Sequence, residues 1–155
     1  KHIYLLGVRS SAFLAGYLNF YFHLIFKNVT LVQSAAGEIF DQMLRIGPGD
    51  VLVGISFPRY SQIAVNAVRF ARDRGADVIA VTDSKMSPIY KMASASLLVS
   101  SDMISFVDSM AAPVSLLNAL IMAVGQQKSE ETAESFSELE RVWSQYGVFG
   151  DAEDE

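Results

Sequence analysis

Hydrophobic residues in this chain fall into short continuous runs that are followed by longer segments with helical spacing. The run Val51–Ile55 contains no charge, as expected for a strand of a parallel sheet that is buried on both faces. After it, Ile63, Ala67 and Phe70 recur on one face of a helix. This stretch therefore predicts a strand, a polar loop and the start of a helix, in that order.

The same alternation extends over most of the chain. A helix over 108–127 would contain Pro113, so we expect either a kink at this proline or a helix that begins close to it. Five strands alternating with helices predict an α/β fold with a five-stranded parallel sheet flanked by helices. The predicted strands are 3–6, 30–32, 51–55, 77–82 and 96–99, and the predicted helices are 11–26, 36–44, 61–74, 88–93, 108–127 and an amphipathic C-terminal helix carrying Phe136, Leu139, Val142, Trp143 and Tyr146.

Two glycine-containing segments predict turns between these elements. In residues 47–50, Gly47, Pro48 and Gly49 supply backbone dihedrals that other residues resist. At Arg74-Gly75, a cation in the last turn and a glycine just beyond it predict the end of a helix.

Composition and charge limit the classes of function. The 155 residues include no cysteine, which excludes disulfides and thiolate metal sites and suits a reducing cytoplasm. The net charge of −5 and the acidic end, residues 151–155, argue against direct binding to nucleic acid. The apolar segment 11–26 is shorter than the ~20 residues that a bilayer requires, so we expect no membrane span. No cluster of side chains indicates a metal site or a cofactor.

Three polar loops follow strands at one edge of the predicted sheet, namely residues 7–11, 56–61 and 83–88. Hydroxyls and arginines beside helix N-termini suit a phosphorylated polyol, because phosphate takes charge-assisted hydrogen bonds there. Each serine alone is more often an ordinary helix cap, and we expect the Ser61 hydroxyl to cap the helix 61–74. Their convergence on one edge is the stronger signal. The residues concerned are Arg9, Ser10, Ser11, Ser56, Arg59, Ser61, Ser84 and Ser87.

The segments 7–11, 55–61 and 75–88 resemble the sugar isomerase (SIS) domain, and most closely the C-terminal effector domain of RpiR-type bacterial transcriptional regulators. The resemblance covers about residues 1–127 and leaves 128–155 as a C-terminal amphipathic helix and acidic tail. It implies a flavodoxin-like three-layer sandwich, usually dimeric, that binds a phosphosugar. In such regulators a helix-turn-helix domain precedes this one. We therefore expect a fragment that begins at Lys1 and contacts DNA only through a domain that this chain lacks.

The sequence departs from the family pattern at two loop positions. Arg9 and Arg59 stand where the family usually has glycine, and Pro58 removes both a hydroxyl and a backbone donor from the second loop. Because a guanidinium suits a second anionic group, we hypothesise a ligand more acidic than a hexose phosphate, such as a sugar-acid phosphate. The alternative is that both arginines face solvent or pair with Asp83 or Asp102.

Three functions remain open at this point. The first is a non-catalytic, phosphosugar-sensing domain of a carbohydrate-responsive regulator, with the ligand held by Arg9, Ser10, Ser11, Ser56, Arg59, Ser61 and Ser84. The second is a phosphosugar isomerase in which Glu38 moves a proton between C1 and C2. The third is a SIS-like module used only for dimerisation. We expect a homodimer formed through the apolar helix 11–26 and the helix 111–124.

Overall fold

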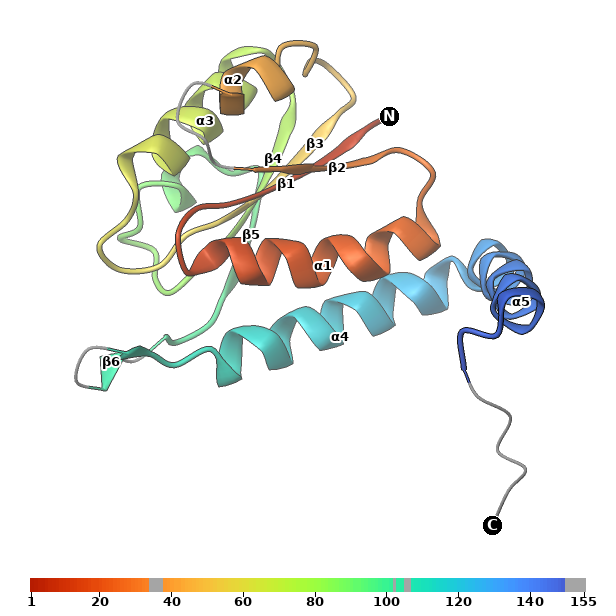
Figure 1. Ribbon diagram of the computed structural model, residues 1–155. Helices are drawn as coiled ribbons and strands as arrows, with labels where there is room; N and C mark the ends of the chain where they lie inside the picture. Colours follow the sequence, from red (N-terminus) through yellow and green to blue (C-terminus); the bar gives the residue numbers. More distant parts are fainter. Residues whose placement is uncertain (34–37, 102, 105–106, 150–155) are drawn as a thin grey trace.

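A computed structural model of the chain describes residues 1–33, 38–101, 103–104 and 107–149. One sheet of five parallel strands runs through the molecule in the order β2-β1-β3-β4-β5. This topology confirms the predicted α/β fold (Figure 1). The strands are β1 (Ile3–Gly7), β2 (Val29–Val32), β3 (Val51–Ile55), β4 (Asp77–Thr82) and β5 (Ala95–Leu98).

Helices cover both faces of this sheet. Figure 1 shows α2 and α3 on one face, and α1 and α4 on the other. The predicted helices exist, although several end earlier or begin later than the sequence indicates, and Ala36 and Gly37 of the predicted second helix lie outside the described residues. The helices are α1 (Ser11–Ile25), α2 (Glu38–Gln42), α3 (Gln62–Asp73), the 3₁₀ turn η1 (Tyr90–Met92), α4 (Ala111–Gln127) and α5 (Ser129–Tyr146).

Two hydrophobic cores lie on the two faces of the sheet. Leu6, Leu52 and Val78 pack into the core under α2 and α3. Their strand neighbours point to the opposite face, where Leu5 and Val53 join α1 and the fully buried Leu117 of α4. Because both faces are buried, the strands read as continuous apolar runs rather than alternating ones.

The start of α4 differs from the prediction. Residues 107–108 belong to the short strand β7 (Val107–Asp108), which pairs antiparallel with β6 (Met103–Ile104), and α4 begins only at Ala111. Two-residue strands are too short to produce a hydrophobic period, so the sequence did not indicate them. Pro113 consequently falls in the first turn of α4, where its missing N–H is not needed.

The turns before β3 and β4 use the predicted glycines. Gly49 and Gly75 have φ angles of 88° and 82°, in the left-handed region that glycine adopts without steric cost. After α3, the N–H of Gly75 donates to the carbonyl of Arg72 and that of Ala76 donates to Ala71, which is the Schellman pattern of a helix end. The sequence thus predicted both turns correctly.

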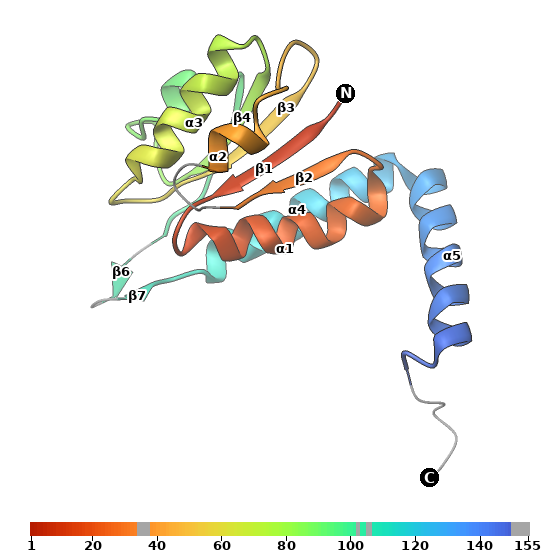
Figure 2. The ribbon, with the colours of Figure 1, turned by 45° about the horizontal axis from the view of Figure 1, so that its top comes forward.

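The C-terminal helix α5 contacts α1 and α4 but extends away from the sheet (Figure 2). None of its residues is buried, and Phe136 and Tyr146 are 40% and 73% exposed. The acidic segment 151–155 lies outside the described residues. Within the described part of the chain, no helix combines the length and the apolar character that crossing a bilayer requires.

Candidate functional site

A pocket of about 510 Å³ opens at the carboxyl ends of β1 and β3. These strands are neighbours, but the chain leaves β1 toward one face of the sheet, into α1, and leaves β3 toward the other face, into α3. The pocket therefore occupies the topological switch point, where open α/β sheets bind their ligands. Its volume lies in the range of roughly 300–1,000 Å³ that is usual for small-molecule sites.

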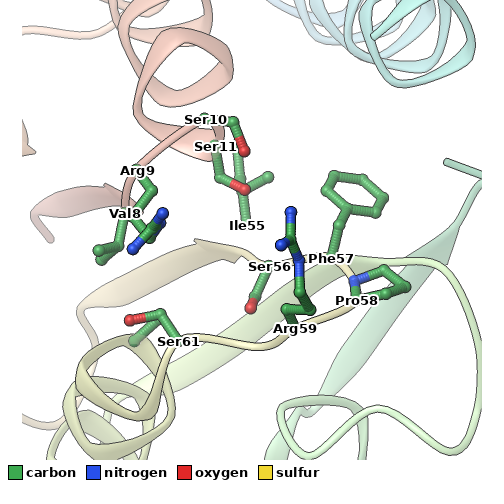
Figure 3. Close-up of a pocket in the computed structure, with 11 residues that line it drawn as sticks. Val8, Arg9, Ser10, Ser11, Ile55, Ser56, Phe57, Pro58, Arg59 and Ser61 are labelled. Atoms are coloured by element: carbon green, nitrogen blue, oxygen red, sulfur yellow. The ribbon is translucent and has the colours of Figure 1, made fainter. Parts of the chain in front are cut away.

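The structure brings most of the predicted site residues together in this pocket (Figure 3). Ser84 is not among the lining residues, and its hydroxyl oxygen accepts the N–H of Met86 at 3.3 Å. A binding role for Ser84 thus stays a prediction. The predicted ligand residues in the lining are Arg9, Ser10, Ser11, Ser56, Arg59 and Ser61, and the other lining residues are Val8, Ile55, Phe57, Pro58 and Ala64.

One wall of the pocket is the start of α1. Ser10 occupies the N-cap position but makes no side-chain cap hydrogen bond, and Ser11 is buried. The carbonyl of Arg9 accepts the N–H of Ala12 at 3.0 Å, which closes the turn into the helix. The N–H of Phe13 likewise donates to the carbonyl of Ser10 at 3.3 Å, so the attraction of this wall for an anion comes from the partial positive charge at the start of the helix dipole.

The opposite wall is the start of α3, where one prediction is wrong. Ser61 occupies the N-cap position with extended backbone, yet its hydroxyl caps no first-turn amide. Its carbonyl accepts the N–H of Val65 at 3.0 Å, and its side chain lines the pocket instead (Figure 3). Two helix N-termini without side-chain caps therefore border the same space.

Ser56 lies between these walls and is held by the neighbouring strand. Its N–H donates to the carbonyl of Val81 at 3.1 Å, and its own carbonyl accepts the hydroxyl of Thr82 at 2.7 Å. The residue is 4% exposed. Because its main-chain groups are bound to β4, the Ser56 side chain has a fixed place in the pocket lining.

The loop after β3 is anchored by Tyr60. Its hydroxyl donates to the carboxylate of Asp83 at 2.7 Å. Burial raises the pKa of Tyr60, and the hydrogen bond to Asp83 raises it further, so the phenol remains a donor at neutral pH. Asp83 thus binds Tyr60 rather than an arginine, whereas Asp102, the other acid considered, lies outside the described residues.

Arg9 and Arg59 have left-handed backbone, with φ angles of 58° and 62°. For a residue with a Cβ this conformation costs roughly 1–2 kcal/mol, which explains why glycine suits both positions. Both side chains are exposed, and neither forms a salt bridge within the described residues. Figure 3 shows both guanidinium groups extending from their loops into the space between the loops.

Glu38, the catalytic candidate of the isomerase hypothesis, lies elsewhere. It is exposed in the first turn of α2 and lines a separate hollow of about 480 Å³ with Phe13, Leu31 and Gln33. This hollow shares no lining residue with the pocket at β1 and β3. Among the described residues, no three His, Cys, Asp or Glu side chains are grouped so that they could hold a metal ion.

Comparison with known proteins gives a family and a set of similar structures. The family model of the SIS domain matches residues 1–123, whereas no curated protein sequence matches. The sugar isomerase domain of an RpiR transcription factor from Sphaerobacter thermophilus is similar, with a TM-score of 0.86 and 23% identity over 91% of this chain and 79% of that chain.

Two further similar structures are a protein solved with a phosphosugar and a protein with an inferred isomerase function. The Vibrio vulnificus NanR protein complexed with ManNAc-6P has a TM-score of 0.79 and 17% identity, over 97% of this chain and 57% of that chain. A Methanococcus jannaschii protein, whose structure infers the function of a 3-hexulose-6-phosphate isomerase, has a TM-score of 0.66 and 14% identity, over 87% of this chain and 76% of that chain. At these identities the likeness establishes the shared fold.

Proposed function

The chain belongs to the SIS domain family, and we propose that it is the phosphosugar-sensing effector domain of a carbohydrate-responsive transcriptional regulator. The observation that carries this proposal is the pocket at β1 and β3, where serines, arginines and two helix N-termini without side-chain caps border one space. The likeness to the RpiR and NanR structures supports a regulator. DNA would be bound by a part of the protein outside these 155 residues, and the cytoplasm is the proposed location.

The composition of the pocket suits a phosphate attached to a polyol. Helix N-termini and serine hydroxyls supply hydrogen-bond donors to phosphate oxygens, and each charge-assisted bond is stronger than a neutral one. The sugar hydroxyls can exchange donors and acceptors with the side chains of Ser10, Ser11, Ser56 and Ser61, all of which line the pocket.

Ligand sensing without turnover is favoured by the position of Glu38. A general base must come within about 2.6–3.2 Å of the proton that it moves, directly or through one water. Glu38 does not line the pocket of the arginines and serines, and its hollow adjoins that pocket at the start of α1, where Ser11 lines one and Ala12 the other. The isomerase is therefore the second candidate.

A thermal-shift experiment tests the binding proposal. At a ligand concentration of 100 times Kd, binding stabilises the native state by about 2.7 kcal/mol, which is a Tm increase of about 5–10 °C for a chain of this size. We expect phosphosugars, but not free sugars, to give this increase and Ser56→Ala to abolish it. Ser137→Ala, an exposed serine of α5, is the matched control and should respond as wild type does. An unchanged response in Ser56→Ala would place the site elsewhere.

An assay for aldose–ketose interconversion separates the three functions. Binding without turnover is the result expected for a sensor. Turnover by the wild type that is lost in Glu38→Gln would establish the isomerase instead. If phosphosugars neither bind nor react, the remaining function is dimerisation.

A homodimer is part of the same proposal. Phe13 and Phe20 of α1 are 81% and 62% exposed, and Met122 of α4 is 66% exposed. Exposed apolar side chains of this size often belong to an interface between protein chains. We expect light scattering at micromolar concentration to give twice the 17.0 kDa mass of the chain. A mass of one chain would contradict a dimer.

A further inference from the structure

Two guanidinium groups enter the pocket from opposite loops, and the positive charge that they bring is not balanced by a neighbouring acidic side chain among the described residues. Among the residues that the structure describes, the pocket lining includes Arg9 and Arg59 but no carboxylate. Neither arginine forms an ion pair in the part of the chain that the structure describes. We propose that Arg9 and Arg59 together bind a second anionic group, so that the ligand is a phosphorylated sugar acid with both a phosphate and a carboxylate. This inference rests on the proposed function and specifies its ligand class.

The charge balance favours a ligand with more than a phosphate. Two arginines contribute two positive charges, and the N-termini of α1 and α3 add roughly half a charge each. A phosphate monoester carries only about −1.5 to −2 at neutral pH. About one positive charge then remains without a partner, which is the charge that a carboxylate neutralises.

The donors on the two arginines match a carboxylate in geometry as well as in charge. A guanidinium presents parallel N–H groups that can bind both oxygens of a carboxylate, whereas backbone amides at a helix start bind phosphate without such a fork. In the loop after β3, Pro58 has no N–H, so this loop has one backbone donor fewer for a phosphate. Arg59, the next residue, supplies side-chain donors in its place.

The surrounding structure fixes the backbone of both arginine-bearing loops before any ligand binds. On one side, Val8 is buried in the core, and the carbonyl of Arg9 is fixed by the N–H of Ala12. On the other side, the hydrogen bond from Tyr60 to Asp83 fixes the residue that follows Arg59. Glycine would allow both left-handed turns without strain, so what arginine adds at these positions is its charged side chain. Because the backbone of both loops is fixed, ligand binding has to order only the arginine side chains, which lowers the entropy lost on binding.

Calorimetric titration of the 155-residue chain tests the inference with matched ligands. Each pair consists of an aldose phosphate and the aldonic acid phosphate of the same carbon chain, from four to six carbons, for example glucose 6-phosphate and 6-phosphogluconate. We expect at least one acid to bind at least tenfold tighter than its neutral partner. Arg9→Gly and Arg59→Gly should each weaken acid binding by about tenfold to a hundredfold, the range for a lost charge-assisted bond, and change aldose phosphate binding by less than about threefold.

Three further variants separate the effect of the positive charge from that of the paired guanidinium N–H groups and from that of folding. Arg9→Lys and Arg59→Lys keep the charge but lose the fork, so each should fall between wild type and the glycine variant. Arg69→Gln removes an exposed arginine of α3 that does not line the pocket, and both affinities should stay as in wild type. Because the glycine variants relieve backbone strain, they are expected to fold.

The possible results distinguish the two proposals. Equal affinity of the wild type for every acid and its neutral partner would overturn this inference and leave phosphosugar binding intact. Equal weakening of both ligand classes in the glycine variants would also overturn it, because the arginines would then be phosphate ligands. Absence of binding by any phosphorylated ligand would overturn the proposed function and this inference together.

Discussion

Loops at both edges of the sheet contain a residue with left-handed backbone, but the residue is glycine at one edge and arginine at the other. At the amino edge, the turns before β3 and β4 have left-handed backbone at Gly49 and Gly75. At the carboxyl edge, the loops after β1 and β3 have the same conformation at Arg9 and Arg59. The amino-edge turns only reverse the chain, so the residue with the lowest strain suffices. Strain is retained at the carboxyl edge, where an added side chain lines a pocket.

Among these substitutions, introducing a side chain at the amino edge should change the stability of the protein most. At Gly75 a Cβ would adopt left-handed backbone and lie 3.3 Å from the Cγ of Pro48. We expect Gly75→Ala to destabilise the protein by about 1–2 kcal/mol, which lowers Tm by about 2–8 °C in thermal unfolding. Gly16→Ala, in α1 where no atom lies within 4 Å of the added Cβ, is the control and should not lower Tm. An unchanged Tm in Gly75→Ala would show that left-handed strain is negligible in this protein.

Removing the Tyr60 hydroxyl, which anchors the loop after β3, should have an intermediate effect on stability. Tyr60→Phe deletes the partly buried hydrogen bond to Asp83, which is worth about 1 kcal/mol or a Tm decrease of about 2–4 °C. The affinity for the ligand should fall as well, because Arg59 is then held less firmly. Tyr146→Phe, at a 73% exposed position of α5, should change neither quantity. If Tyr60→Phe lowered the stability but left the ligand affinity unchanged, the hydrogen bond to Asp83 would have no part in positioning Arg59 for binding.

Relieving the strain at the carboxyl edge should have the smallest effect and the opposite sign. Arg9→Gly or Arg59→Gly removes the left-handed cost but increases the entropy of the unfolded chain, so we expect a net gain of about 0.5–1 kcal/mol. The Tm without ligand should then rise by about 1–4 °C. Arg45→Gly, an exposed arginine without positive φ, should give no such gain. A decrease in Tm in both loop variants would mean that the arginines stabilise the free protein.

The sheet and the location of the pocket could be predicted from the sequence because they depend on patterns that extend over many residues. Uninterrupted apolar runs indicated parallel strands, and polar loops at their carboxyl ends indicated one pocket. Six of the seven proposed ligand residues, all except Ser84, indeed line it. The glycine turns were predictable because their residues have few other backbone preferences.

Other features depend on tertiary contacts that no local pattern encodes. Whether Ser61 caps α3 depends on the direction in which the loop enters the helix, and here the hydroxyl does not reach an amide. The hydrogen bond between Tyr60 and Asp83 exists because β4 lies beside β3. Nothing in an arginine favours left-handed backbone, so the φ angles of Arg9 and Arg59 follow from the anchored loops around them.

The left-handed arginines also affect how this domain can change during evolution. Every arginine codon can be converted to a glycine codon by a single base change. At Arg9 and Arg59 this exchange requires no new path of the backbone, because glycine adopts the same φ angles freely. The charge that the pocket presents could therefore be gained or lost in one mutational step per loop, while the sheet and both cores stay as they are.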